Sequence, residues 1–196
     1  MNRRNSQCGF TLIEVLVTFL IVAIGLLGLG ALQVNTMNNS FETYQRALVA
    51  SIVEDMAARI RMNANAAVAG EYFVDMDNVA ASFSCGGTIS QRDLCEWKAQ
   101  IMGCSAQTEV GPELNCESER AAQNMGAPLA ARGCIDRLGE SNSGETWIRV
   151  SVAWIGTTSQ SDTPLECQPE DTGQPLDEAY RRVVFRDVAV REVLAL

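Results

Sequence analysis

Residues 10–32 read FTLIEVLVTFLIVAIGLLGLGAL, an apolar run that contains one charged side chain, Glu14. As a helix this run is about 35 Å long at about 1.5 Å per residue, which is enough to cross the hydrocarbon core of a membrane. The short segment before it carries Arg3 and Arg4. Positive charge on that side keeps this end of the chain in the cytoplasm and sends the rest outward. The sequence therefore predicts a single membrane-spanning helix followed by an exported region.

The helical pattern continues past the apolar run. Residues 33–63 contain no proline and no glycine, the two residues that interrupt helices most strongly. Apolar side chains recur there at steps of three and four residues, which places them on one face of a helix; they are Phe41, Tyr44, Leu48, Ile52 and Met56. We expect an amphipathic continuation of the helix over residues 33–64, with Asp55 and Arg59 paired on its surface. A globular head then occupies residues 65–196.

The cysteines indicate an oxidising compartment. The six that follow Cys8 lie at least nine positions apart, so the chain has no C-x-x-C pair of the kind that zinc sites and thioredoxin-like motifs use. Well-spaced cysteines in a domain of this size favour three disulfides; the alternative is buried free thiols in a cytosolic protein. The disulfide candidates are Cys85, Cys95, Cys104, Cys116, Cys134 and Cys167.

Composition argues against an enzyme and against a nucleic-acid-binding protein. The chain has no histidine, the commonest general base and the commonest transition-metal ligand. It has no G-x-S-x-G, P-loop or H-E-x-x-H motif. Its formal net charge is −9, whereas affinity for nucleic acid comes mainly from basic side chains that neutralise phosphates. We predict no catalytic residues, no metal and no cofactor.

The stretch Gly9-Phe10-Thr11-Leu12-Ile13-Glu14 abuts the apolar run. It resembles the processing site of type IV prepilins and of the related pseudopilins. The resemblance implies that a prepilin peptidase cuts between Gly9 and Phe10, removing residues 1–9 as a leader, and that the new amino group of Phe10 is methylated. Residues 10–32 are then kept, first as an inner-membrane anchor and later as a packing helix in a filament. An ordinary signal peptidase would instead cut after the run, near Ala31.

Glu14 is an ionisable group at the start of a membrane segment, where a carboxylate is costly and usually has a functional partner. After cleavage it would be the fifth residue. The resemblance implies that it pairs with the terminal amine of a neighbouring subunit during assembly. The alternative is a carboxylate that reaches the headgroup region without a partner.

Three glycines, Gly25, Gly28 and Gly30, each lower helix propensity in the run by about 1 kcal/mol. They do not form the G-x-x-x-G face of membrane helix dimers. We expect them to serve close helix packing or local unwinding in a filament.

Two further stretches, IGLLGLGALQ at residues 24–33 and EDMAARIRMN at residues 54–63, resemble the PilV-type minor pilins of type IV pili. Together with the processing site this resemblance covers about the first third of the chain. A minor pseudopilin of a type II secretion system shares the processing site and remains an alternative.

The end of the chain indicates β-strands. Within residues 146–154, Ile148, Val150, Val152 and Trp154 alternate with the polar Arg149 and Ser151, a period of two. Residues 182–193 indicate a second strand and residues 133–138 a weaker one, followed by a turn over residues 139–144. We expect an α+β pilin fold, in which the long N-terminal helix packs on a small antiparallel sheet with disulfide-stapled loops.

The middle of the head has weaker patterns. Residues 92–102 and 117–125 indicate short helices, the first bounded by Gly103. A long loop is expected over residues 156–179, and loops of this length are usually functional or tethered. Its carboxylates could ligate calcium, although a solvated acidic loop is the commoner case; they are Asp162, Glu166, Glu170, Asp171, Asp177 and Glu178.

Six cysteines allow fifteen pairings, and the sequence does not choose among them. We favour sequential pairing because short loops close at the lowest entropic cost. The pairs would be Cys85–Cys95, Cys104–Cys116 and Cys134–Cys167, of which the last would tether the acidic loop.

These observations favour a structural subunit. The first hypothesis is a minor pilin that acts in pilus initiation at the tip, and so in adhesion and twitching motility, with other minor pilins, the major pilin and a tip adhesin as partners. The second is a tip-located adhesive binding module. The third is a pseudopilin that acts in protein secretion.

Overall fold

A computed structural model of the chain describes residues 11–75, 83–84, 87–103, 113–114, 128, 130–159, 167 and 179–192. It separates the chain into two compact units, residues 1–41 and residues 42–196. The expected leader, the predicted short helix over residues 117–125 and the six carboxylates of the acidic loop lie outside the described residues.

The first helix, α1, runs from Leu12 to Met62 and confirms the long N-terminal helix. In its first unit, residues 12–41, the side chains are exposed throughout. In the second unit one face of α1 is buried in the head, and its members recur every three or four residues; they are Gln45, Val49, Ile52, Val53, Met56, Ala57 and Ile60. The short α2 follows over Ala64–Val68.

The buried face of α1 differs from the predicted stripe at its beginning. Ile52 and Met56 are buried, and Leu48 packs partly against the core. Phe41 and Tyr44 are 45% and 54% exposed, so their assignment to the packed stripe was wrong. The buried face begins with Gln45 and Val49 instead, because the head contacts α1 along a line displaced around the helix from the one that the aromatic residues mark.

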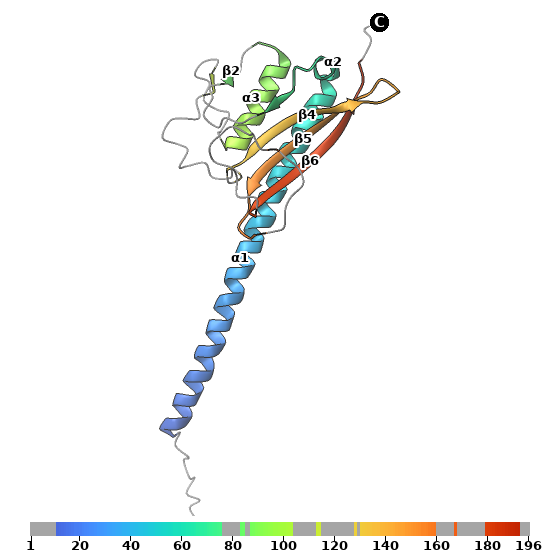
Figure 1. Cartoon of the computed structure of the whole chain (residues 1–196). Helices are drawn as coiled ribbons and strands as arrows, with labels where there is room; N and C mark the ends of the chain where they lie inside the picture. The colour runs from blue at the N-terminus through green and yellow to red at the C-terminus, as the bar shows by residue number, and fades with distance from the viewer. Residues whose placement is uncertain are drawn as a thin grey trace, which may run out of the picture. The chain divides into compact units, whose positions relative to one another are not determined.

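The head contains an antiparallel sheet of order β1-β4-β5-β6 (Figure 1). Three long strands, β4 (Arg132–Glu140), β5 (Thr146–Ile155) and β6 (Arg181–Val190), confirm the predicted three-stranded sheet. The two-residue β1 (Val74–Asp75) pairs with β4. A separate small sheet pairs β2 (Phe83–Ser84) with β3 (Glu113–Leu114).

Two strand boundaries differ from those predicted. β4 continues to Glu140 because the chain accommodates Gly139 in a β-bulge, with φ at +146°, and the turn is left to residues 141–145. β6 ends at Val190, whereas the predicted strand reached Val193, which lies outside the described residues.

One face of β5 is buried along its length, and the other is buried at Ser151 and Ala153. Ile148, Val150, Val152 and Trp154 lie in the core with α1, as predicted. The other face was expected to carry the polar Arg149 and Ser151; in the structure Ser151 is 3% exposed and Ala153 is fully buried. The reason is that Cys167 lies against this face and forms a small second core with Cys134 and Ala153.

The predicted helix over residues 92–102 is α3 (Ile89–Met102). It begins three residues earlier because Thr88 and Gln91 form a capping box that satisfies its first amide groups. Gly103 ends it in a left-handed conformation, as the sequence indicated.

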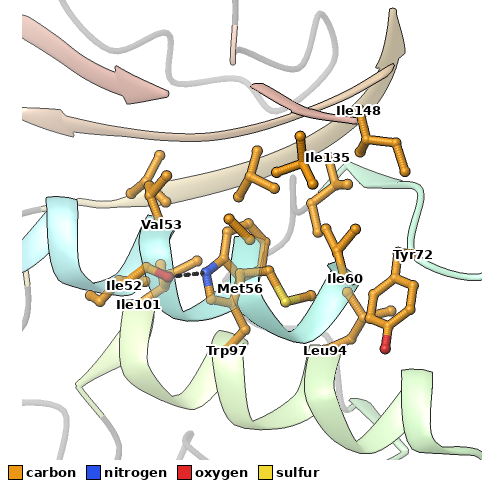
Figure 2. Close-up of a cluster of buried hydrophobic side chains, with 14 of the residues drawn as sticks. Ile52, Val53, Met56, Ile60, Tyr72, Leu94, Trp97, Ile101, Ile135 and Ile148 are labelled. Atoms are coloured by element: carbon orange, nitrogen blue, oxygen red, sulfur yellow. Dashed lines mark hydrogen bonds between the residues drawn. The ribbon is translucent and has the colours of Figure 1, made fainter. Parts of the chain in front are cut away.

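Trp97 joins α3 to both α1 and β4 (Figure 2). Its indole Nε1–H donates a hydrogen bond of 3.2 Å to the backbone oxygen of Ile52. On β4 the ring meets Gly133, where a Cβ would lie 2.6 Å from the Trp97 ring and from Ile101. A glycine at residue 133 is therefore what allows α3 to approach β4 this closely.

Candidate functional site

The apolar surface of α1 is the first candidate site. An 18-residue window of this helix has a mean hydropathy of 2.7 and no residue buried by the rest of the chain. By length and composition the helix can cross a membrane. An exposed apolar surface of this extent requires cover from lipid or from another protein chain.

Glu14 is the one acidic residue in the first turn of α1, and it is exposed. Its backbone N–H donates to the backbone oxygen of Thr11 at 3.1 Å. Among the described residues none pairs with its carboxylate. The first turn of a helix favours negative charge, because the helix dipole is positive there. Gly9 and Phe10 lie outside the described residues.

Gly25, Gly28 and Gly30 lie inside α1, which is continuous through them. A Cβ added at any of the three would meet no atom within 4 Å. No packing within the described residues therefore requires glycine at these positions. Their expected role in helix packing or unwinding within a filament stays a prediction.

A polar clamp holds the beginning of the head on α1. Arg182 of β6 donates from Nε to Oε1 of Glu42 at 2.7 Å, and Thr158 donates from Oγ1 to Oε2 at 3.0 Å. Gly156 allows this approach, since a Cβ there would lie 2.9 Å from Oε1 of Glu42. Burial on its own would raise the pKa of Glu42, but the hydrogen bonds from Arg182 and Thr158 and the charge of Arg182 lower it below its ordinary value.

A second polar cluster joins α1 to α3. Arg59 pairs with Asp55 at 2.9 Å, as predicted, and also with Asp93 at 2.9 Å and Glu96 at 2.6 Å. The hydroxyl of Tyr72 donates to the same Asp93 carboxylate at 2.6 Å. Burial disfavours the charge of Arg59, but the three carboxylates outweigh it and raise the pKa. The expected surface pair is thus part of a half-buried connection between two helices.

Sequence reasoning missed both clusters because their partners are far apart in the chain. Glu42 and Arg182 are separated by 140 positions, and Arg59 and Asp93 by 34. Neither separation carries a periodic signal. The capping box of α3 was readable, however, since Thr88 precedes Gln91 at the motif's spacing of three.

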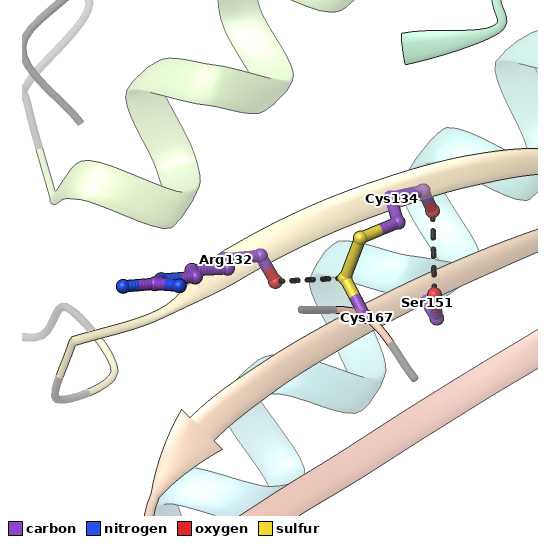
Figure 3. Close-up of a disulfide and its surroundings, with 4 residues drawn as sticks. All are labelled: Arg132, Cys134, Ser151 and Cys167. Carbon is purple, nitrogen blue, oxygen red and sulfur yellow. Dashed lines mark hydrogen bonds between the residues drawn. A yellow bond between two sulfur atoms is a disulfide. The ribbon is translucent and has the colours of Figure 1, made fainter. Parts of the chain in front are cut away.

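The expected pairing of Cys134 with Cys167 is present, with a Cα–Cα distance of 5.7 Å (Figure 3). Ser151 Oγ donates to the backbone oxygen of Cys134 at 3.4 Å beside it. Cys95 is also disulfide-bonded. The other candidates, Cys85, Cys104 and Cys116, lie outside the described residues. In the described part of the chain no three acidic, cysteine or histidine residues gather as a metal site.

Comparison with known families gives one match. Residues 4–30 match the family described as the prokaryotic N-terminal methylation motif. This motif marks type IV pilin-like and pseudopilin-like proteins, which are structural subunits and not enzymes. It implies processing by a prepilin peptidase and assembly with other pilins. Comparisons of the chain with curated proteins and with solved structures gave no match.

Proposed function

We propose that this chain is a minor pilin of a type IV pilus, of the PilV type, which joins other minor pilins in a tip complex from which the fibre grows. The observation that carries the proposal is the joining of two features in one helix. The methylation motif occupies residues 4–30, and the same helix continues as the spine of an α+β head. The pilus would serve adhesion and twitching motility.

Processing at Gly9 is the first step of the proposed function. Cleavage between Gly9 and Phe10 frees an amino group at the start of an apolar helix, and methylation of Phe10 follows. Residues 10–32 stay in the inner membrane with the head in the periplasm, where disulfides such as Cys134–Cys167 form. The subunit then leaves the bilayer for the filament, where neighbouring helices replace lipid as the cover of its apolar surface.

Glu14 guides this transfer. A carboxylate in an apolar segment favours a site that offers it a positive charge, and the amino group of a neighbouring subunit is such a charge. No described side chain pairs with Glu14, and in this proposal the amino group of the neighbouring subunit is its partner. The pairing fixes the axial position of the incoming helix.

The test of processing compares Gly9→Val with the control Ala31→Val. We expect Gly9→Val to leave a full-length, unmethylated precursor in the inner membrane. Ala31→Val should yield the mature chain beginning at methylated Phe10, as in the wild type. Mass spectrometry of the N-terminal peptide gives the answer, and a mature chain that begins after Ala31 would contradict the proposal.

The test of assembly uses Glu14→Leu. The matched control is Val17→Leu, which lies about one helical turn further along α1. Glu14→Leu makes the segment more apolar, so membrane insertion should persist. Its recovery in sheared pili should fall strongly, whereas Val17→Leu should be recovered normally. Normal recovery of Glu14→Leu would show that the carboxylate has no assembly partner.

The same sheared pili distinguish a pilus from a secretion system. Mass spectrometry should find this chain together with other minor pilins and a tip adhesin. Absence from sheared pili, combined with loss of protein secretion when the gene is deleted, would identify a type II secretion pseudopilin instead.

A further inference from the structure

The sheet of the head has two edges, and they are built differently. On one side β4 pairs with β1 and is interrupted by the bulge at Gly139. On the other side β6 is the outermost strand (Figure 1). Its sequence, RRVVFRDVAV, contains no proline, glycine or lysine, and its pairing with β5 shows no register shift. Such features usually protect an edge, because a regular edge strand pairs readily with another chain.

The backbone groups of β6 point alternately toward β5 and away from the sheet. The N–H of Gly156 donates to the backbone oxygen of Tyr180 at 2.8 Å, next to the Ile155–Arg181 pair. In an antiparallel ladder every second pair of opposite residues exchanges hydrogen bonds. Arg182 and every second residue after it therefore bond to β5. The residues between them direct their N–H and C=O groups outward and form what we call the β6 edge; they are Val183, Phe185, Asp187 and Ala189.

The β6 edge is complementary to an extended polypeptide. In the part of the chain that the structure describes, no hydrogen bond satisfies its outward backbone groups. These groups recur at every second residue, about 7 Å apart along the strand. The backbone of another strand presents matching donors and acceptors at the same spacing, which is the basis of recognition by strand addition.

The side of the β6 edge that faces α1 is basic. Arg186 of β6 is half exposed and pairs with Glu54 of α1 at 3.3 Å, so this part of α1 lies beside the edge. Arg46 and Arg61 lie eight positions before and seven positions after Glu54, spacings that place them on the same side of the helix. Both are exposed, and no described carboxylate pairs with either. The chain as a whole has a net charge of −9, so this excess of positive charge is local.

A second copy of the chain complements this edge poorly. Pairing of β6 with the β6 of another copy would bring a second set of the same three arginines to one seam, and like charges across a strand pair are destabilising. A segment with carboxylates on alternate residues would neutralise them instead. The charge of the edge therefore favours an acidic strand from a different protein.

We propose that the β6 edge binds an extended acidic segment of a different protein as an additional strand of the sheet. The added strand is antiparallel, like the other strands of this sheet, because antiparallel pairing is the more stable kind. Its backbone exchanges hydrogen bonds with the outward groups of the β6 edge, and its carboxylates lie on the side of Arg186 and α1. The edge belongs to the head alone, so the inference does not depend on incorporation into a pilus.

The first test measures binding of a designed peptide to the full mature chain in a zwitterionic detergent. The probe is the acetylated and amidated peptide TETETET, which carries a fluorescent label on a flexible linker. In the proposed pairing its threonines lie opposite the residues of the β6 edge and its glutamates face α1. We expect a saturable rise in fluorescence anisotropy, and TKTKTKT should bind at least tenfold more weakly. Absence of saturable binding by TETETET, or equal binding of the two peptides, would overturn the proposal.

The second test separates strand addition from attraction between charges. N-methylation of the third and fifth residues of TETETET removes two N–H groups that point at β6, and it should weaken binding at least tenfold. N-methylation of the second and sixth residues changes only groups that point to solvent, and it should weaken binding no more than twofold. Equal effects of the two modifications would show that the peptide does not bind as a strand.

The third test locates the binding on the protein. Arg186→Glu should reverse the preference, so that TKTKTKT binds more tightly than TETETET. The matched control is Arg191→Glu, because Arg191 is also exposed and forms one pair at 3.3 Å, with Glu145; this variant should keep the preference of the wild type. An unchanged preference in Arg186→Glu would place the peptide elsewhere and overturn the proposal. A dimer of the chain in sedimentation experiments that TETETET dissociates would also overturn it, since the edge would then serve a second copy.

Discussion

The two units of the protein share one helix, and they use it differently. In residues 12–32 apolar side chains surround the helix; Ile24 is 63% exposed there. In residues 42–62 only one face is apolar, and Ile60 on that face is fully buried. The same residue type in the same secondary structure thus has opposite environments.

This contrast shows what packs against the apolar surface of α1 in each unit. A helix with one apolar stripe is satisfied by its own domain, as α1 is by α3 and the sheet. A helix that is apolar on all sides is stable only within a membrane or within an assembly of similar helices. The second unit of this chain is therefore self-sufficient in packing, whereas the first depends on partners outside the chain.

The sharpest test of this comparison is a pair of identical substitutions. Ile60→Ala removes a fully buried side chain and should lower the free energy of unfolding of the head by about 4 kcal/mol. Ile24→Ala should leave that free energy unchanged, because Ile24 lies in the first unit and is 63% exposed. Denaturant unfolding of the mature chain, followed by the fluorescence of the buried tryptophans, measures both. Equal losses would show that the first unit also contributes to folding of the head.

Sequence patterns predicted the elements whose burial or apolar character follows a regular pattern. The alternation of Ile148, Val150 and Val152 indicates a strand with one buried face, and the unbroken apolar run indicates a helix long enough to cross a membrane. The stripe through Phe41 and Tyr44 failed because the buried face of α1 is displaced around the helix from the face that these residues mark, and it begins with Gln45. Exposed aromatic residues at the edge of a domain look the same in sequence as buried ones.

The contacts between elements were not predictable in the same way. Ser151 sits at an outward position of β5, and only the arrival of Cys167 from a distant segment buries it. The Glu42–Arg182 clamp likewise joins residues that no local pattern connects. The proposed processing site could be read from the sequence alone, because Gly9, Phe10 and Glu14 lie within one continuous six-residue motif.

The second prediction concerns the Cys134–Cys167 disulfide of the head. The described residues of the first unit contain no cysteine. Replacing Cys134 and Cys167 together with serine should lower the free energy of unfolding by about 3–4 kcal/mol, since the bridge closes a loop with a sequence separation of 33. Membrane insertion should be unaffected. Urea unfolding and a membrane flotation assay measure the two effects. A head as stable as the wild type would show that the packing of Ala153 and its neighbours holds this face without the bridge.

The third prediction compares glycines in the two units. Gly133→Ala places a methyl group 2.6 Å from Trp97 and Ile101, and this overpacking should cost about 1–3 kcal/mol. Gly25→Ala meets open space and should slightly favour the helix, by up to about 1 kcal/mol. Thermal unfolding of both variants tests the difference. If Gly25→Ala folds normally but is lost from sheared pili, the glycines of the apolar run serve packing in the filament.

The smallest expected effect lies at the boundary of the second unit, where Glu42 meets Arg182. The pKa of Glu42 is lowered in the folded head, so its contribution is complete above the ordinary pKa of about 4.5 and is lost as the pH falls through the lower folded value. Glu42→Gln should therefore destabilise the head by about 1–2 kcal/mol at pH 7, the range for a hydrogen bond to a charged group. At pH 3 the variant and the wild type should be closer in stability.

The control is Glu54→Gln, because the Glu54–Arg186 pair is half exposed and 3.3 Å long, so its removal should cost less than 1 kcal/mol. A difference between Glu42→Gln and the wild type that stays constant from pH 7 to pH 3 would assign the effect to packing of the side chain, and the ionised clamp would then have no part in holding the head on α1.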